Sequence, residues 1–361
     1  MQKRLLISYL YCNLGGVVTV IKQRLPHLLR DGWVVDCVFK QDNGGAQDLL
    51  DAGVNDLRIL GNDLQAEVAR RCPEYDLVTI FDDPDVLSAA VASAPNVIYE
   101  IHTPIDSVLD KNDPDDLGQC AKIIVPSQWS KSWIARRFPE LDAEQILVCP
   151  NIVAEDSQED VATVAFEERE LLWVGKLAPY KNWKEALRIA SLLLADETIS
   201  RLTFVTGGNL TNQLSVDLMT EMAHLGITDR VRWLHGVPYV ALLEAYRAAA
   251  DKGGALLSCS LAESFCYVIH EAIRAGLPVI ATDVGAVRDV IEDGRTGQLY
   301  DLGDYEQARQ KVARLMSDDP ARAAICGASM DLLTSRYGST MLAAGYTEAL
   351  NALHAVEAAS I

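Results

Sequence analysis

The sequence predicts an α/β protein with two doubly wound halves, and three observations lead to this prediction. Short apolar runs rich in Val and Ile alternate with longer amphipathic segments along the chain, and strands that are apolar on both faces are typical of parallel sheets covered by helices. A chain of 361 residues exceeds what one ordinary core holds. The alternation breaks once, over the acidic segment 150–169. We therefore expect one domain over residues 1–152 and a second over 168–338.

The first half consists of apolar strands separated by helical segments. The predicted strands are 3–9, 33–39, 76–81, 96–101, 121–125 and 145–149. Between the first two, residues 17–30 have the apolar spacing of an amphipathic helix. Pro150 ends the last strand, because proline has no N–H to donate to a sheet.

The second half repeats the same alternation. Its predicted strands are 170–174, 202–206, 230–234, 254–258 and 278–281. Its predicted helices include 183–195, 211–225 and 239–250. A final helix, about 339–361, comes after this half is complete, and we expect it to pack back toward the first domain.

The composition excludes several classes of function. A formal net charge of −19 argues against a nucleic-acid partner, which requires clustered Lys and Arg. No apolar run reaches about 18 residues, so we expect no transmembrane segment, while association with a membrane surface stays open. The N-terminal residues lack a small-residue cleavage site and are interpreted as the first strand. The eight cysteines form no CxxC pair and no zinc spacing, which predicts reduced thiols in a cytoplasmic protein.

The segment around Glu263 and Glu271 carries the most information about function. A strand leads into a polar turn with Glu263, a helix is expected over about 265–275, and Gly276 ends that helix. The N–H groups at a helix start suit a diphosphate, and eight residues of helix separate the two glutamates by roughly 12 Å. Because a carboxylate accepts hydrogen bonds from two neighbouring hydroxyls, we expect Glu271 to bind a ribose and Glu263 a sugar. Alone, the spacing also fits two surface or capping glutamates.

This segment resembles the family 4 glycosyltransferases, which are retaining enzymes of the GT-B architecture. The family's E-x7-E motif continues as A-x-x-x-G-x-P-V, and the same positions here are Glu263, Glu271, Ala272, Gly276, Pro278 and Val279. The resemblance covers most of the chain. It implies two Rossmann-like doubly wound domains facing across a cleft, with an acceptor-binding domain first and a nucleotide-sugar donor-binding domain second.

The resemblance also extends upstream, where V-G-K-L-x-x-x-K contains Gly175, Lys176 and Lys181. In the family these two cations hold the diphosphate and stabilise the charge that develops as it leaves. Lys176 replaces the usual Arg, which loses a bidentate donor, and Asn182 replaces a Gly. In the family, backbone amides also approach the sugar and phosphate at the positions that are Ser264, Phe265, Cys266 and Tyr267 here. Ser264 and Cys266 replace glycines at two of these positions.

Glycines elsewhere and one histidine complete the site that the resemblance implies. Gly207 and Gly236 follow predicted strands of the second half, and in relatives the second of these loops lies near the base. In the first half, Gly15 and Gly16 follow the first strand and are expected to close over the donor phosphates. His102, in YEIHTP, is expected to contact the transferred sugar or the acceptor, although a lone histidine after a strand is often structural.

The function that the resemblance implies is sugar transfer with retention of the anomeric configuration. The donor is a UDP- or GDP-sugar, and the acceptor hydroxyl belongs to a saccharide, a small molecule or a glycan intermediate. We expect a metal-independent hexosyltransferase that requires no cofactor, in which the leaving phosphate helps to deprotonate the acceptor. The alternatives are a non-catalytic nucleotide-sugar-binding subunit and another GT-B enzyme, such as a sugar-nucleotide epimerase or a glycan phosphorylase.

Overall fold

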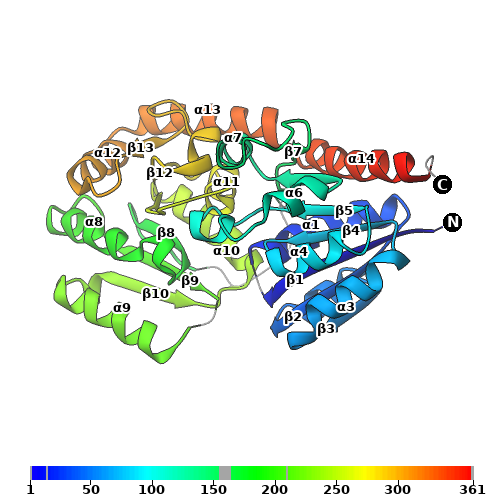
Figure 1. Ribbon diagram of the computed structural model, residues 1–361. Helices are drawn as coiled ribbons and strands as arrows, with labels where there is room; N and C mark the ends of the chain where they lie inside the picture. The colour runs from blue at the N-terminus through cyan, green and yellow to red at the C-terminus, as the bar shows by residue number, and fades with distance from the viewer. Residues whose placement is uncertain (1, 14, 154–163, 209, 359–361) are drawn as a thin grey trace. The chain divides into compact units, whose positions relative to one another are not determined.

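A computed structural model describes residues 2–13, 15–153, 164–208 and 210–358. The chain divides into two compact units (Figure 1). The first comprises Met1–Ala154 with Gly338–Ile361, and the second comprises Glu155–Tyr337. Residues 154–163, which are half of the predicted acidic segment 150–169, lie outside the described residues.

The first unit contains a parallel seven-stranded sheet in the order β3-β2-β1-β4-β5-β6-β7. Its strands are β1 (Lys3–Asn13), β2 (Trp33–Asn43), β3 (Asp56–Ile59), β4 (Leu77–Phe81), β5 (Val97–Glu100), β6 (Lys122–Val125) and β7 (Ile146–Val148). Its helices are α1 (Val17–Arg30), α2 (Ala46–Asp51), α3 (Leu64–Arg71), α4 (Pro84–Val91), α5 (Asp106–Leu109), α6 (Pro114–Gln119), α7 (Gln128–Arg137) and α14 (Ser339–Ala358). Two short 3-10 helices also belong to it, η1 (Gly61–Asp63) and η2 (Cys72–Glu74). The C-terminal helix α14 packs against α1.

The second unit contains a parallel six-stranded sheet in the order β10-β9-β8-β11-β12-β13. Its strands are β8 (Leu171–Lys176), β9 (Leu202–Gly207), β10 (Val231–His235), β11 (Ala255–Ser258), β12 (Val279–Thr282) and β13 (Gln298–Tyr300). Its helices are α8 (Trp183–Ala195), α9 (Asn212–His224), α10 (Tyr239–Asp251), α11 (Tyr267–Arg274), α12 (Tyr305–Ser317) and α13 (Asp319–Tyr337). Its 3-10 helices are η3 (Pro179–Lys181), η4 (Thr228–Arg230) and η5 (Gly285–Asp289).

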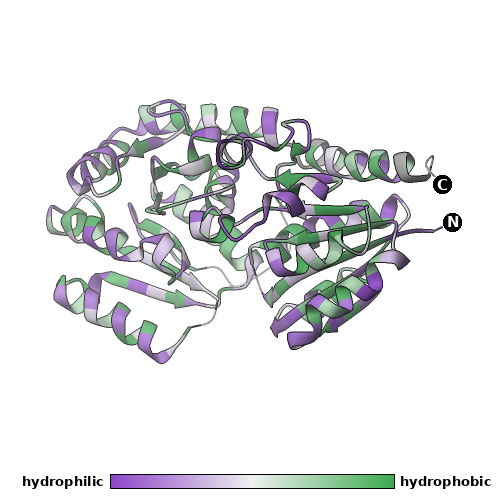
Figure 2. Ribbon diagram, in the orientation of Figure 1, coloured by the Kyte–Doolittle hydropathy of each residue, from purple (hydrophilic) through white to green (hydrophobic). Residues whose placement is uncertain are grey.

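The predicted α/β class is confirmed, because both sheets are parallel and reverse their strand order once, between β1 and β4 and between β8 and β11. The sequence did not predict β3 or β13. The first is a short edge strand with half of its residues exposed, and the second has only three residues. The strands are mostly apolar and the outer helix faces mostly polar (Figure 2), as expected for sheets that helices cover on both faces.

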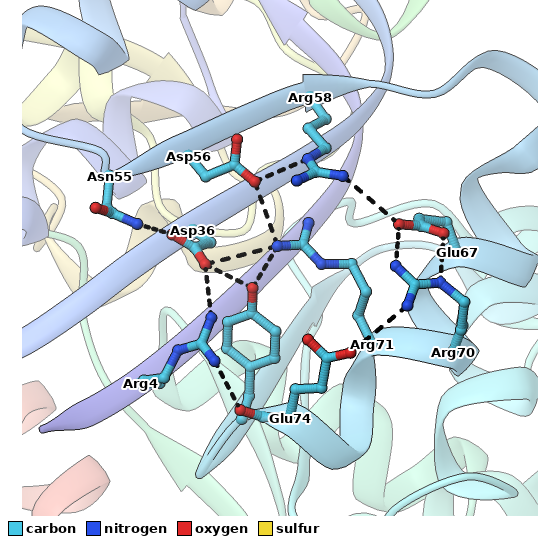
Figure 3. Close-up of polar contacts among 10 residues, drawn as sticks. Arg4, Asp36, Asn55, Asp56, Arg58, Glu67, Arg70, Arg71 and Glu74 are labelled. Carbon is cyan, nitrogen blue, oxygen red and sulfur yellow. Dashed lines mark hydrogen bonds and ion pairs between the residues drawn. The ribbon is translucent and has the colours of Figure 1, made fainter. Parts of the chain in front are cut away.

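A polar network stabilises the first unit at the amino ends of its strands (Figure 3). The Asp36 carboxylate accepts hydrogen bonds from Asn55 Nδ2 at 2.7 Å and from the Tyr75 hydroxyl at 2.5 Å. Arg4 and Arg71 also form ion pairs with it. Burial raises the pKa of Asp36, but these hydrogen bonds and charges outweigh burial and hold the pKa below its ordinary value. Because ligands bind parallel sheets at the carboxyl ends of the strands, we interpret this network as structural.

Two further findings bear on the predictions from composition. All eight cysteines lie outside disulfides. Among the described residues, no helix is both long and apolar enough to cross a membrane, and no group of His, Cys, Asp and Glu has the arrangement of a metal site.

Candidate functional site

The predicted residues of the second unit gather at the carboxyl ends of its strands. Gly175 and Lys176 end β8, and Lys176 lies beside Gly207, the last residue of β9. Gly236 directly follows β10, and its N–H donates to the Thr206 carbonyl at 2.9 Å. The turn with Glu263 follows β11. This is the edge of a doubly wound sheet at which ligands bind.

Lys181 and Glu263 form an ion pair at this edge. Lys181 Nζ lies 2.6 Å from Glu263 Oε1, and the Ser260 hydroxyl donates to the same oxygen at 2.6 Å. The two side chains are only 17% and 11% exposed. Burial lowers the pKa of Lys181, but the carboxylate outweighs burial and raises the pKa above its ordinary value. The fold therefore brings together a cation and a carboxylate that lie 82 positions apart.

Lys176 adds a second positive charge. A Cβ on Gly208 would lie 3.3 Å from Lys176 Cγ and Cδ, so the lysine stem passes directly over that glycine. Burial lowers the pKa of Lys176, and the charge of Lys181 lowers it further. Two ammonium groups that repel each other are stabilised when an anion binds both, which is the chemistry of a diphosphate site.

Backbone hydrogen bonds fix the turn that carries Glu263. The Ala286 N–H donates to the Glu263 carbonyl at 2.8 Å, and the Leu261 N–H donates to the Tyr180 carbonyl at 2.7 Å. Gly285 has a φ of 55°, and a Cβ there would lie 2.2 Å from the Glu263 carbonyl oxygen. Only glycine fits this close approach of two backbones, so Gly285 sets the position of the Glu263 turn.

Two departures from the family pattern have a conformational explanation. Asn182 and Cys266, which stand where the family has glycine, both adopt the left-handed region, with φ of 48° and 69°. Asn tolerates this region well, whereas for Cys it costs on the order of 1 kcal/mol. The Cys266 side chain is buried, and burial raises the pKa of its thiol. The backbone shape expected of glycine is thus retained at both positions.

The helix after Glu263 begins later than predicted. It starts at Tyr267 rather than near Phe265, so Glu271 lies one turn inside α11 and Glu263 lies in the preceding turn. The predicted separation along a single helix axis is therefore wrong. Phe265 is buried with its ring stacked on His270, 4.2 Å between centroids. His270 is fully buried, and burial lowers its pKa to about 4, which fits a structural role.

Glu271 is buried beside two tyrosines that the sequence analysis missed. The Tyr246 hydroxyl donates to Glu271 Oε2 at 3.2 Å. Burial raises the pKa of Glu271 to about 7, although hydrogen bonds from Tyr239 and Tyr246 act in the opposite direction. The two tyrosines are seven positions apart on α10, so they share a face of that helix. The seven-residue spacing of the two tyrosines was the sequence signal that could have identified them.

In the first unit, Gly15 and Gly16 connect β1 to α1. Their φ values of 133° and 57° lie in the region that favours glycine, and Gly16 directly precedes the first residue of α1. Their predicted contact with donor phosphates stays a prediction.

His102 lies just beyond β5 and is held at two points. Its backbone N–H donates to Asp82 Oδ1 at 2.8 Å, and its Nε2 lies 3.0 Å from Glu100 Oε2. Asp82 also accepts from the N–H and hydroxyl groups of Thr103, so it organises this turn. The sequence analysis missed Glu100, whose signal was a carboxylate at the end of an otherwise apolar strand.

Comparisons with known proteins find sequence similarity to glycosyltransferases. Residues 156–328 match the family model described as glycosyl transferases group 1. The chain is 36% identical over 197 residues to a D-inositol 3-phosphate glycosyltransferase of Thermobispora bispora, covering 52% of this chain and 45% of that protein. It is 31% identical over 161 residues to the protein of that name from Corynebacterium diphtheriae, covering 44% and 37%. The chain thus spans less than half the length of either relative.

Solved structures show the same fold. The chain is similar to HepE of Anabaena in complex with UDP and glucose, with a TM-score of 0.78 at 17% identity, covering 97% of this chain and 100% of that one. It is also similar to a sucrose-phosphate synthase from Thermosynechococcus elongatus, with a TM-score of 0.77 at 15% identity, covering 98% and 100%. At these identities the likeness shows the fold alone, which is of the GT-B type with two Rossmann-like sheets. The cleft between them stays a prediction.

Proposed function

We propose that the chain transfers a sugar from a nucleoside-diphosphate sugar to a hydroxyl acceptor, because residues 156–328 match the family model of the group 1 glycosyltransferases. The observation that carries the proposal is the Lys181–Glu263 pair beside Lys176, at the carboxyl edge of the second sheet. The lysines offer charge for a diphosphate, and the carboxylate offers acceptors for sugar hydroxyls.

Each part of the donor has a proposed partner. Lys176 and Lys181 bind the diphosphate, Glu263 binds hydroxyls of the transferred sugar, and Glu271 binds the ribose. The backbone around Gly207 and Gly236 approaches the nucleotide, and the amides over 264–267 approach the sugar and phosphate. From the first unit, Gly15 and Gly16 approach the phosphates, and His102 contacts the transferred sugar or the acceptor.

The proposed reaction retains the anomeric configuration. The bond from the anomeric carbon to the leaving phosphate oxygen breaks, and the acceptor oxygen bonds to the same face of that carbon. The acceptor proton passes to the leaving phosphate. The lysines stabilise the charge that develops on this phosphate, and such donors contribute on the order of a few kcal/mol each. With this charge supplied by side chains, we propose that the reaction requires no metal.

A non-catalytic nucleotide-sugar-binding subunit is the main alternative. On this alternative, the departures from the family pattern at Lys176, Ser264 and Cys266 are signs of a decayed site. Cys266 nevertheless keeps the left-handed backbone that glycine would adopt, as does Asn182. Retention of this conformation, at some cost for Cys266, favours a site that still functions.

The test is a transfer assay with UDP- and GDP-sugars, with chelator present and D-inositol 3-phosphate as the first acceptor because two relatives carry that name. We expect a glycosylated product whose anomeric configuration, measured by NMR, matches the donor. An inverted product would refute the retaining mechanism. Epimerised donor without acceptor would indicate an epimerase. Tight donor binding without turnover, across a broad acceptor panel, would indicate the subunit.

A further inference from the structure

Three side chains surround the buried Glu100 carboxylate in the first unit. Glu100 ends β5, Arg24 comes from α1, His102 follows β5, and Tyr346 comes from α14. The side chains of Arg24, Glu100 and His102 are 3%, 0% and 8% exposed. Side chains from α1 and from the last helix, α14, therefore contact the same carboxylate.

Each oxygen of Glu100 has two partners. Oε1 accepts from Arg24 Nη1 at 2.9 Å and from the Tyr346 hydroxyl at 3.0 Å. Oε2 accepts from the same Nη1 at 2.7 Å and lies 3.0 Å from His102 Nε2. Burial raises the pKa of Glu100, but the charge of Arg24 outweighs burial and the pKa stays below its ordinary value. The group is therefore a carboxylate, which only accepts hydrogen bonds.

This geometry determines the chemistry of the histidine ring. Because the carboxylate only accepts, His102 Nε2 must donate to Oε2. A neutral imidazole then carries its proton on Nε2 and its lone pair on Nδ1. If the Glu100 carboxylate rotated away from the imidazole ring, His102 Nε2 would lose the acceptor that requires it to carry the proton. The groups that fix the position of Glu100 therefore also fix the tautomer of His102.

Tyr346 is one of these groups, and it reaches Glu100 from the C-terminal helix. The Arg24 guanidinium lies 3.8 Å from the Tyr346 ring centroid, and the ring is buried. Further along α14, Asn351 accepts hydrogen bonds from Lys3 and Trp33, which fixes the helix on the sheet. The Tyr346 hydroxyl thus has a defined position over Glu100.

We propose that Glu100 is a positioning residue that holds His102 in the Nε2–H tautomer, and that Tyr346 on α14 orients Glu100 for this task. The C-terminal helix therefore contributes to the state of a site histidine as well as to packing. The effect on transfer rests on the proposed function, whereas the tautomer does not.

The main alternative is that the cluster only stabilises the fold, and the Asp36 network provides a matched comparison (Figure 3). There, too, an arginine covers a tyrosine ring, with Arg4 Cζ 4.4 Å from the Tyr75 centroid. The Tyr75 hydroxyl likewise donates to the buried Asp36 carboxylate. In the described part of the chain, the partners of the Asp36 carboxylate are Asn55, Tyr75, Arg4 and Arg71 rather than a histidine, and the network lies at the opposite ends of the strands. Like Tyr346→Phe, Tyr75→Phe removes a hydroxyl that donates to a buried carboxylate, and it also removes the acceptor of a hydrogen bond from Arg71. Of the two carboxylates, the one that lies against His102 is Glu100.

The first experiment measures the tautomer directly in the unmodified chain. Long-range ¹H–¹⁵N NMR spectra at a pH where the ring is neutral distinguish the two nitrogens, and His102→Gln assigns the signal. We expect the proton on Nε2. A dominant Nδ1–H form would overturn the inference, and this result requires neither a stable variant nor an active enzyme.

The second experiment compares Tyr346→Phe with Tyr75→Phe. We expect both to lower the unfolding midpoint, Tyr75→Phe by more, because the Tyr75 hydroxyl also accepts a hydrogen bond from Arg71. Only Tyr346→Phe should give a mixture of His102 tautomers and reduce kcat, by about tenfold, with the donor KM unchanged. An unchanged tautomer in Tyr346→Phe, or an equal loss of kcat in both variants, would overturn the role of α14. Failure of the unmodified chain to transfer sugar would refute the proposed function and leave the tautomer result standing.

Discussion

Replacing Glu271 with Gln should stabilise the protein near neutral pH. Burial raises the pKa of this carboxyl from 4.5 to about 7, so the folded state binds the proton more tightly than the unfolded state. The stability that depends on this proton is fully present below about pH 4.5 and is lost as the pH rises to about 7. At about 1.4 kcal/mol per pKa unit, the charged carboxylate costs the fold about 3 kcal/mol above pH 7.

The Glu271→Gln side chain stays neutral and avoids this cost. Urea unfolding at several pH values from 5 to 8 should therefore show an advantage of the variant that grows with pH. Glu170→Gln is the matched control, because Glu170 is equally buried but paired with Arg232. That control should destabilise the protein at pH 7, since it leaves the partly buried Arg232 guanidinium without its charge partner. An advantage of Glu271→Gln that does not change with pH would refute the reasoning.

The same group should make nucleotide binding depend on pH. The carboxylate is the form that accepts hydrogen bonds from both ribose hydroxyls, so protonation below about pH 7 should weaken binding by about tenfold per pH unit. Calorimetry with UDP and GDP should show the ratio of unmodified to Glu271→Gln affinity rising with pH to a plateau. Taking the ratio removes the titration of the nucleotide itself. Equal affinities at pH 8 would contradict the proposed ribose contact.

Three further perturbations test other parts of the structure. Lys181→Ala should reduce kcat by about 100-fold and weaken donor binding less. The control Lys184→Ala, on the exposed face of α8, should change neither kcat nor donor binding. Steady-state kinetics that show only a KM effect for Lys181→Ala would contradict its role with the leaving group. Gly285→Ala should lower both thermal stability and kcat, because its Cβ would meet the Glu263 carbonyl; a crystal structure with an unmoved turn would contradict this. Asp36→Asn should lower the unfolding midpoint, because the buried Arg71 loses one of its two charge partners and the half-exposed Arg4 loses its ion pair, and donor KM measured on the folded fraction should not change.

Much of the fold was predictable because its signals are local. The apolar runs of β1 and β8 are long enough to stand out, whereas β3 and β13 are too short or too exposed to do so. The glutamate pair was visible for the same reason, since both residues lie in one continuous segment with a helix stop between strands. The start of α11 was missed because the left-handed Cys266 ends the turn there, and a cysteine gives no local signal for that conformation.

The sequence by itself determined the two parallel sheets and the identity of the charged groups at one sheet edge, because periodicity and residue chemistry act over short stretches of chain. Tertiary structure decided which groups touch. It paired Lys181 with Glu263, buried Glu271 beside Tyr246, and brought Tyr346 to Glu100 across 246 positions. These contacts set the charge states of the site, because burial and nearby charges shift a pKa only when the chain has folded.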